Sequence, residues 1–147
     1  MKKNILFLVL LISYLSVLGQ SECSHCNIEV LKRTESSIDS LSNKEVRLFL
    51  CSLDSSCVNN VEFSEWSNEL LFKVLNKKAE TFLMVLEGGE NVNTVYILSE
   101  IEAPIIEIDI QSIYNKVKNL SDDYLNRNYV LNALIIAGGK QGLIIKK

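Results

Sequence analysis

The sequence predicts an all-α domain of antiparallel helix pairs, arranged as a small bundle or a short stack of helical repeats. Apolar residues recur at helical spacing through most of the chain. Capping residues and glycine pairs separate these stretches, and the sequence contains a single proline and no Ser/Gly-rich linker. The rival is an α+β fold with a β-hairpin around residues 92–110, where β-branched residues are frequent.

The first two predicted helices are separated by a turn at residues 41–42. Residues 27–40 show a loose helical spacing of apolar side chains. Ser42 and Glu45 then have the spacing of a capping box, in which the serine hydroxyl and the glutamate carboxylate each accept a backbone N–H of the other residue. Apolar residues follow at i, i+3, i+4 and i+7, namely Val46, Phe49, Leu50 and Leu53. This pattern predicts an amphipathic helix with a defined start.

A longer helix is predicted to begin at Asn59 or Asn60. Its wide apolar face comprises Phe63, Trp66, Leu70, Leu71, Val74 and Leu75. A turn at residues 76–78 leads to a further helix that contains residues 82–86. Because glycine favours helix C-termini, we expect that helix to stop at Gly88 and Gly89.

The region from residue 92 to residue 118 fits two patterns. Residues 106–110 alternate between isoleucine and acidic residues, as a half-buried strand would. A helix that begins at Pro104 also fits, and its register continues to Val117, whereas the alternation stops at Ile110. We therefore favour the helix over the hairpin.

The last predicted helix has an acid-rich start at residues 121–123, which suits the helix dipole. Its apolar residues are Leu125, Tyr129, Leu131, Leu134 and Ile135. We expect it to end at Gly138 and Gly139. The short apolar tail, residues 143–147, is expected to pack back onto the domain.

Residues 1–19 have the layout of a secretory signal peptide. Lys2 and Lys3 precede an apolar run over residues 5–18, and Gly19 is a small residue at the expected cleavage position. The run is shorter than the about 20 apolar residues that a membrane anchor needs. The sequence therefore predicts one disulfide-stapled, mainly helical domain over residues 20–147, secreted or periplasmic, with no membrane span after cleavage.

The charge of the chain narrows the class of partner. The formal net charge of −3 becomes −5 once Lys2 and Lys3 are removed. Nucleic acids and anionic membrane surfaces attract basic stripes, so neither is an expected partner. Another protein of the envelope or exterior is the expected one.

All four cysteines lie in the first third of the mature chain: Cys23, Cys26, Cys51 and Cys57. An even number of cysteines in an exported chain predicts disulfides. A zinc site and a redox-active Cys-x-x-C are the alternatives, but an oxidising compartment argues against zinc and the motif does not follow a strand. A c-type haem site would need histidine where Asn27 stands.

The pairing of the cysteines follows from the predicted helical hairpin. If the first two helices pack antiparallel about residues 41–42, positions pair outward from the turn. Cys26 is then expected to bond Cys51, and Cys23 to bond Cys57.

One group of side chains could carry chemistry. Glu62, Glu65 and Glu69 recur at i, i+3 and i+7, so they share one ridge of a helix. Two carboxylates could support a hydrolase, although a solvated helix face is the commoner origin of such a ridge. His25 is the sole histidine and is expected to be an exposed polar residue. We assign no catalytic, cofactor or metal residue.

The leading hypothesis is an exported small helical domain that acts by protein binding and needs no cofactor. A carboxylate-based hydrolase on the Glu62/Glu65/Glu69 ridge and a structural envelope component are the alternatives. The absence of a recognisable catalytic motif makes an enzyme the less favoured class.

Overall fold

The structure is a computed structural model that describes residues 23–147, so the predicted signal peptide lies outside the described residues. Within them every regular element is a helix. The elements are α2 (Ile28–Ser36), α3 (Asn43–Ser52), the 3₁₀ helix η1 (Ser55–Asn59), α4 (Val61–Lys77), α5 (Ala79–Gly88), α6 (Thr94–Ile101), α7 (Ile110–Lys118) and α8 (Arg127–Lys140). The all-α prediction is confirmed, and the alternative β-hairpin at residues 92–110 is wrong.

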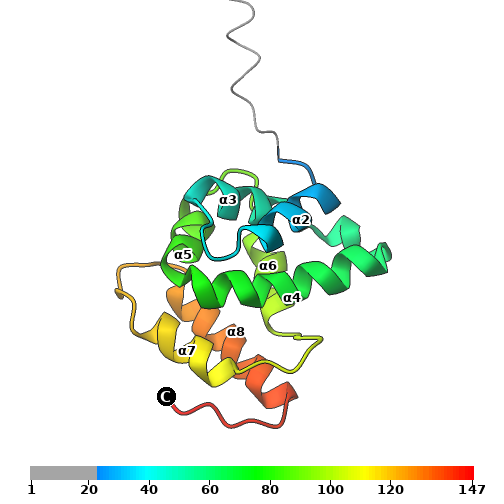
Figure 1. The fold of residues 1–147 in the computed structure, drawn as a ribbon. Coiled ribbons are helices and arrows are strands. Elements are labelled where there is room, and N and C mark those ends of the chain that lie inside the picture. Colours follow the sequence, from blue (N-terminus) through cyan, green and yellow to red (C-terminus); the bar gives the residue numbers. More distant parts are fainter. Residues whose placement is uncertain (1–22) are drawn as a thin grey trace, which may run out of the picture.

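Helix α4 is the central element of the fold (Figure 1). Its 17 residues span about 25 Å at 1.5 Å per residue. Helices α2 and α3 pack against each other, and α2 also packs on α4. Helices α7 and α8 form a second packed pair on the opposite side of α4 (Figure 1). The arrangement is that of a small bundle or helical stack.

One hydrophobic core joins these layers. The largest fully buried side chains are Phe49, Phe63, Phe72, Phe82, Leu31, Leu50, Leu70, Leu71, Leu75, Leu83, Ile97 and Ile101. The apolar stripes predicted for α3 and α4 therefore face the core. Trp66 differs from the prediction, because it is only half-buried at the edge of the core.

Local signals place the starts of α3 and α4 as predicted. The Ser42 N–H donates to Glu45 Oε2 at 2.8 Å, and the Glu45 N–H donates to Ser42 Oγ at 3.3 Å, which completes the capping box. At the start of α4, the Phe63 N–H donates to Asn60 Oδ1 at 3.2 Å. Helix α5 ends at Gly88, also as predicted.

The predicted helix start at Pro104 is wrong. Residues 104–109 lie outside any helix, and α7 begins at Ile110. Asp109 caps α7, because its Oδ1 accepts the Ser112 N–H at 3.0 Å. This cap defines a start six residues later than the proline pattern suggested.

The last helix begins later than predicted and also ends later. Ser121 accepts the Asp123 N–H in a turn, and α8 starts only at Arg127. Leu125, which precedes the helix, and Tyr129, which lies within it, are both exposed, contrary to the prediction. Gly138 lies inside α8 instead of ending it.

The tail packs back as predicted, but through one side chain. Ile145 is buried against Gly138, where an added Cβ would lie 2.7 Å from Ile145 Cγ1. The neighbouring Ile144 points outward and is 94% exposed. Gln111 fixes the tail by accepting the Lys146 N–H at 2.7 Å and donating to the Lys146 carbonyl at 3.2 Å.

Candidate functional site

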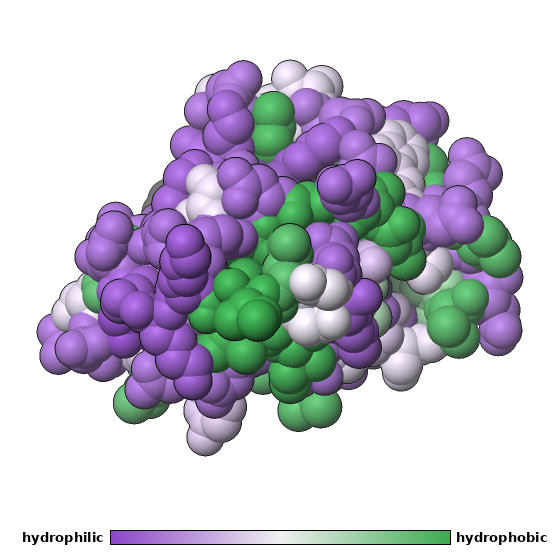
Figure 2. All heavy atoms as spheres, turned by 90° about the horizontal axis from the view of Figure 1, so that it is seen from below, coloured by the Kyte–Doolittle hydropathy of each residue, from purple (hydrophilic) through white to green (hydrophobic). Residues whose placement is uncertain are grey.

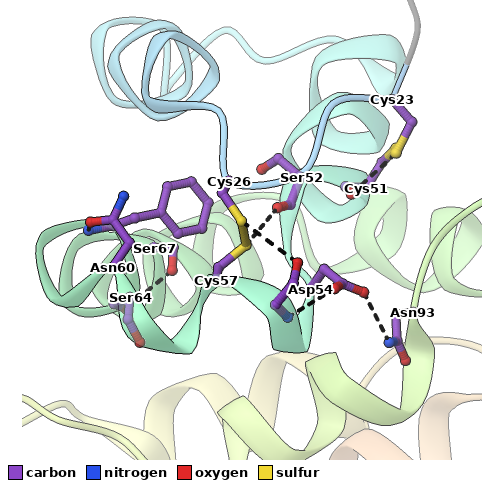
Figure 3. The surroundings of a disulfide bond; sticks show 12 residues. Cys23, Cys26, Cys51, Ser52, Asp54, Cys57, Asn60, Ser64, Ser67 and Asn93 are labelled. Atoms are coloured by element: carbon purple, nitrogen blue, oxygen red, sulfur yellow. Dashed lines mark hydrogen bonds between the residues drawn. A yellow bond between two sulfur atoms is a disulfide. The ribbon is translucent and has the colours of Figure 1, made fainter.

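Two disulfides attach the segment before α2 to the end of α3 and to η1 (Figure 3). Cys23 bonds Cys51 with a Cα–Cα distance of 5.7 Å, and Cys26 bonds Cys57 with a Cα–Cα distance of 5.3 Å. The prediction that disulfides join the two parts of the chain is confirmed. The predicted pairs, Cys23–Cys57 and Cys26–Cys51, are wrong.

The pairing differs because the bonded segments run in the same direction. The predicted pairs require the two cysteine-bearing segments to run antiparallel on either side of the turn. Instead, the Cys26 N–H donates to the Ser52 carbonyl at 3.0 Å, which aligns the N-terminal segment with the chain that leaves α3. Cys23, the first cysteine of the N-terminal segment, therefore bonds Cys51, the first cysteine of the other segment. Cys26 then bonds Cys57 in η1.

Asp54 connects this disulfide region to α6. Its Oδ1 accepts the Ser56 N–H at 2.9 Å at the start of η1, and its Oδ2 accepts from Asn93 Nδ2 at 3.5 Å (Figure 3). The hydrogen bond from the Ser56 backbone lowers the pKa of Asp54 below its ordinary value. His25 lies nearby and is exposed, as predicted.

The predicted glutamate ridge forms one side of a groove of about 550 Å³. Its lining consists of Glu62, Glu65, Trp66, Glu69, Ile105 and Ile106. The two isoleucines come from the α6–α7 loop and are 54% and 37% exposed. The structure thus brings the carboxylates of α4 beside an apolar surface that sequence reasoning had assigned to a helix.

Buried Asn68 holds that loop in place. The Asn68 side chain is on α4, and the residue is 2% exposed. Its Oδ1 accepts the Ile105 N–H at 3.2 Å, and its Nδ2 donates to the carbonyls of Glu100 at 3.1 Å and Ala103 at 3.3 Å. One amide therefore joins the end of α6 and the loop to α4. Sequence reasoning missed this residue, although a polar side chain within an otherwise apolar helix face was the available signal.

A second contact fixes the other side of the loop. Gln141 Nε2 donates to the Ile106 carbonyl at 2.8 Å. Gln141 and Leu143 also line a smaller hollow of about 370 Å³ with residues 104–108. Ile105 and Ile106 therefore line both the groove and this hollow beside the C-terminal tail. Figure 2 shows hydrophobic residues gathered in the middle of the underside, with hydrophilic residues around them.

Two of the three carboxylates in the groove are free of ion pairs within residues 23–147. Glu69 pairs with Lys73 at 2.7 Å, and this hydrogen bond raises the pKa of Lys73. Glu62 and Glu65 are exposed and form no ion pair with any described residue. The groove can therefore offer negative charge beside an apolar floor, which suits an apolar group flanked by cations.

In the part of the chain that the structure describes, no group of three or more His, Cys, Asp or Glu side chains is placed to hold a metal ion. None of the helices over residues 23–147 is long and apolar enough to cross a membrane. Comparisons with protein-family models, with curated proteins and with solved structures find no match to this chain.

Proposed function

We propose that this protein is exported and works by binding another protein of the envelope or exterior through the groove between α4 and the α6–α7 loop. The partner presents apolar side chains flanked by lysine or arginine. The observation that carries this proposal is the combination of Glu62 and Glu65 with the apolar floor of Trp66, Ile105 and Ile106. Apolar anchors supply most of the affinity of such sites, and the surrounding charges select the partner.

The arrangement of the carboxylates favours binding over hydrolysis. Glu62 and Glu69 are seven residues apart on one helix, so their positions differ by about 10 Å along its axis. Glu69 is already paired with Lys73. Glu62 and Glu65 are exposed to solvent, whereas a general acid needs a desolvated environment that tunes its proton affinity.

The two disulfides support an extracytoplasmic setting. Disulfides form and persist in oxidising compartments and are rare in the cytosol. The predicted signal peptide over residues 1–19 agrees with this compartment. A partner is therefore to be sought among envelope or exterior proteins.

The single tryptophan provides a direct test. Trp66 is the only tryptophan of the chain and lines the groove, so its fluorescence reports occupancy. We expect a blocked peptide of alternating leucine and lysine to change the emission of Trp66 saturably. Glu65→Lys should weaken this binding, because it replaces an attractive charge with a repulsive one.

The matched control is Glu90→Lys, which makes the same charge change at an exposed residue outside the groove. Equal weakening by both variants would show that the peptide responds only to net charge. Capture of one envelope protein by the wild type and by Glu90→Lys, but not by Glu65→Lys, would support the proposal in the native setting. No saturable change of Trp66 emission with any basic apolar peptide would contradict it.

A further inference from the structure

A further pocket lies between the start of α3 and the end of α5. Its volume is about 310 Å³. Its charged side chains are basic, whereas those of the groove are acidic. The lining residues are Asn43, Lys44, Arg47, Met84, Val85, Gly88 and Gly89. A hydrogen bond from Thr81 Oγ1 to Asn43 Oδ1 at 3.3 Å ties the first turns of the two helices together. The pocket is thus built from elements that do not contribute to the groove.

The rim of this pocket is basic. Lys44 and Arg47 are three residues apart on α3, so they lie on the same face of the helix. Both residues are exposed, and neither forms an ion pair with any residue between 23 and 147. These two cations are therefore available to carboxylates of a partner.

The floor of the pocket is apolar, and one of its lining glycines has open space around it. Met84 is 40% exposed, although it is a large apolar residue. A Cβ added at Gly88 would meet no atom within 4 Å, so the fold does not require glycine there. Gly89 differs, because a Cβ at that position would lie 2.5 Å from the Val85 carbonyl oxygen. Gly88 lines the pocket, and a side chain at this position would begin without a steric clash.

We infer that this pocket is a second docking site, which takes one apolar side chain of an acidic segment of a partner protein. The volume is at the lower end for ligand sites, which suits a single anchoring side chain better than a large cofactor. Lys44 and Arg47 select carboxylates beside that anchor. The pocket thus suits an acidic segment, whereas the groove is proposed to bind a basic one.

The two sites can be occupied together. The groove and the pocket share no lining residue: the groove is formed by α4 and the α6–α7 loop, whereas the pocket is formed by α3, α5 and Gly89. One molecule could therefore connect a basic segment to an acidic one.

The test is an NMR titration of the isotope-labelled, disulfide-bonded protein with a blocked peptide that has phenylalanine between two pairs of aspartates. We expect the amide signals of Arg47, Met84 and Gly88 to shift saturably. Arg47→Glu should weaken the affinity by about tenfold or more, because it reverses a charge at the rim. Gly88→Leu should weaken it similarly by filling the pocket, and Gly139→Leu is its control at an equally open glycine on α8.

The proposal is overturned if a peptide with lysines in place of the aspartates binds equally well. It is also overturned if Gly88→Leu binds like the wild type, or if sodium decanoate shifts these amides when the acidic peptide does not. Self-association of the protein through Arg47 without binding of the peptide would instead identify a second copy as the occupant. Should Gly88→Leu fail to fold, Lys44→Glu replaces it. Glu65→Lys should leave the affinity unchanged, which separates this test from that of the groove.

Discussion

Asn68 Oδ1 accepts the backbone N–H of Ile105 at 3.2 Å, across 37 residues of sequence. Asn68 is buried on α4, whereas Ile105 is exposed in the groove. A core residue therefore positions a surface residue of the proposed binding site. The contact explains why the α6–α7 loop lies beside the glutamate ridge.

Asn68→Ala should both destabilise the protein and release the loop. The substitution leaves the Ile105 N–H and the Ala103 carbonyl without their partner, which costs about 1 to 3 kcal/mol of the free energy of unfolding. Urea denaturation measures this loss, and hydrogen exchange should be faster at the Ile105 amide. Asn132→Ala on the exposed face of α8 is the control. Unchanged stability and exchange in Asn68→Ala would refute the role given to this amide.

The disulfide pairing can be read by peptide mapping without reduction. We expect fragments that join Cys23 to Cys51 and Cys26 to Cys57. The bonds close loops with separations of 28 and 31 residues, and the loop-entropy model gives about 3 to 4 kcal/mol for the first bond formed. Replacing Cys26 and Cys57 with serine should therefore lower the midpoint of denaturation. Nested pairs in the map would contradict the structure.

Alanine substitutions at two neighbouring glycines in α8 should change the stability of the protein in opposite directions. Gly138→Ala places a Cβ 2.7 Å from Ile145 Cγ1, so it should displace the tail and cost about 1 to 3 kcal/mol. Gly139→Ala meets no atom within 4 Å and should stabilise the helix by about 0.5 to 1 kcal/mol. Thermal denaturation of the two variants provides the comparison. Equal effects would show that Ile145 does not pack on Gly138.

Alkaline titration should distinguish Tyr96 from an ordinary tyrosine. Burial, with the charge of nearby Glu100, raises the pKa of Tyr96 from 10.0 to about 12. The folded state therefore favours the neutral phenol. Its contribution to stability is complete below pH 10 and is lost as the pH rises towards about 12.

Tyr96→Phe should consequently reduce the dependence of the unfolding free energy on pH between 10 and about 12. The ultraviolet absorbance of the phenolate measures the titration, with the difference between wild type and variant assigned to Tyr96. A tyrosine that ionises in this difference spectrum near pH 10 would rule out the buried environment.

The helix starts at Ser42 and Asn60 could be predicted because their capping signals lie within three residues of sequence. The α6–α7 loop could not, because its conformation depends on Asn68 far away in the chain. The position of Gly138 could not be predicted either. Glycine favours a helix end by its local preference, whereas Gly138 lies inside α8 and faces Ile145 of the tail. The glutamate ridge of the groove could be predicted from the sequence, whereas the position of Ile105 and Ile106 beside it could not.

Helix α6 is fastened at both ends. At its start, the Asn93 side chain donates to Asp54, and at its end Asn68 holds the Glu100 and Ala103 carbonyls. A helix of eight residues is too short to persist alone in water. Ile97 and Ile101 are also fully buried, so α6 cannot leave the core without exposing them. We therefore expect α6 to unfold together with α4, so that the start of the α6–α7 loop stays anchored until the domain itself unfolds.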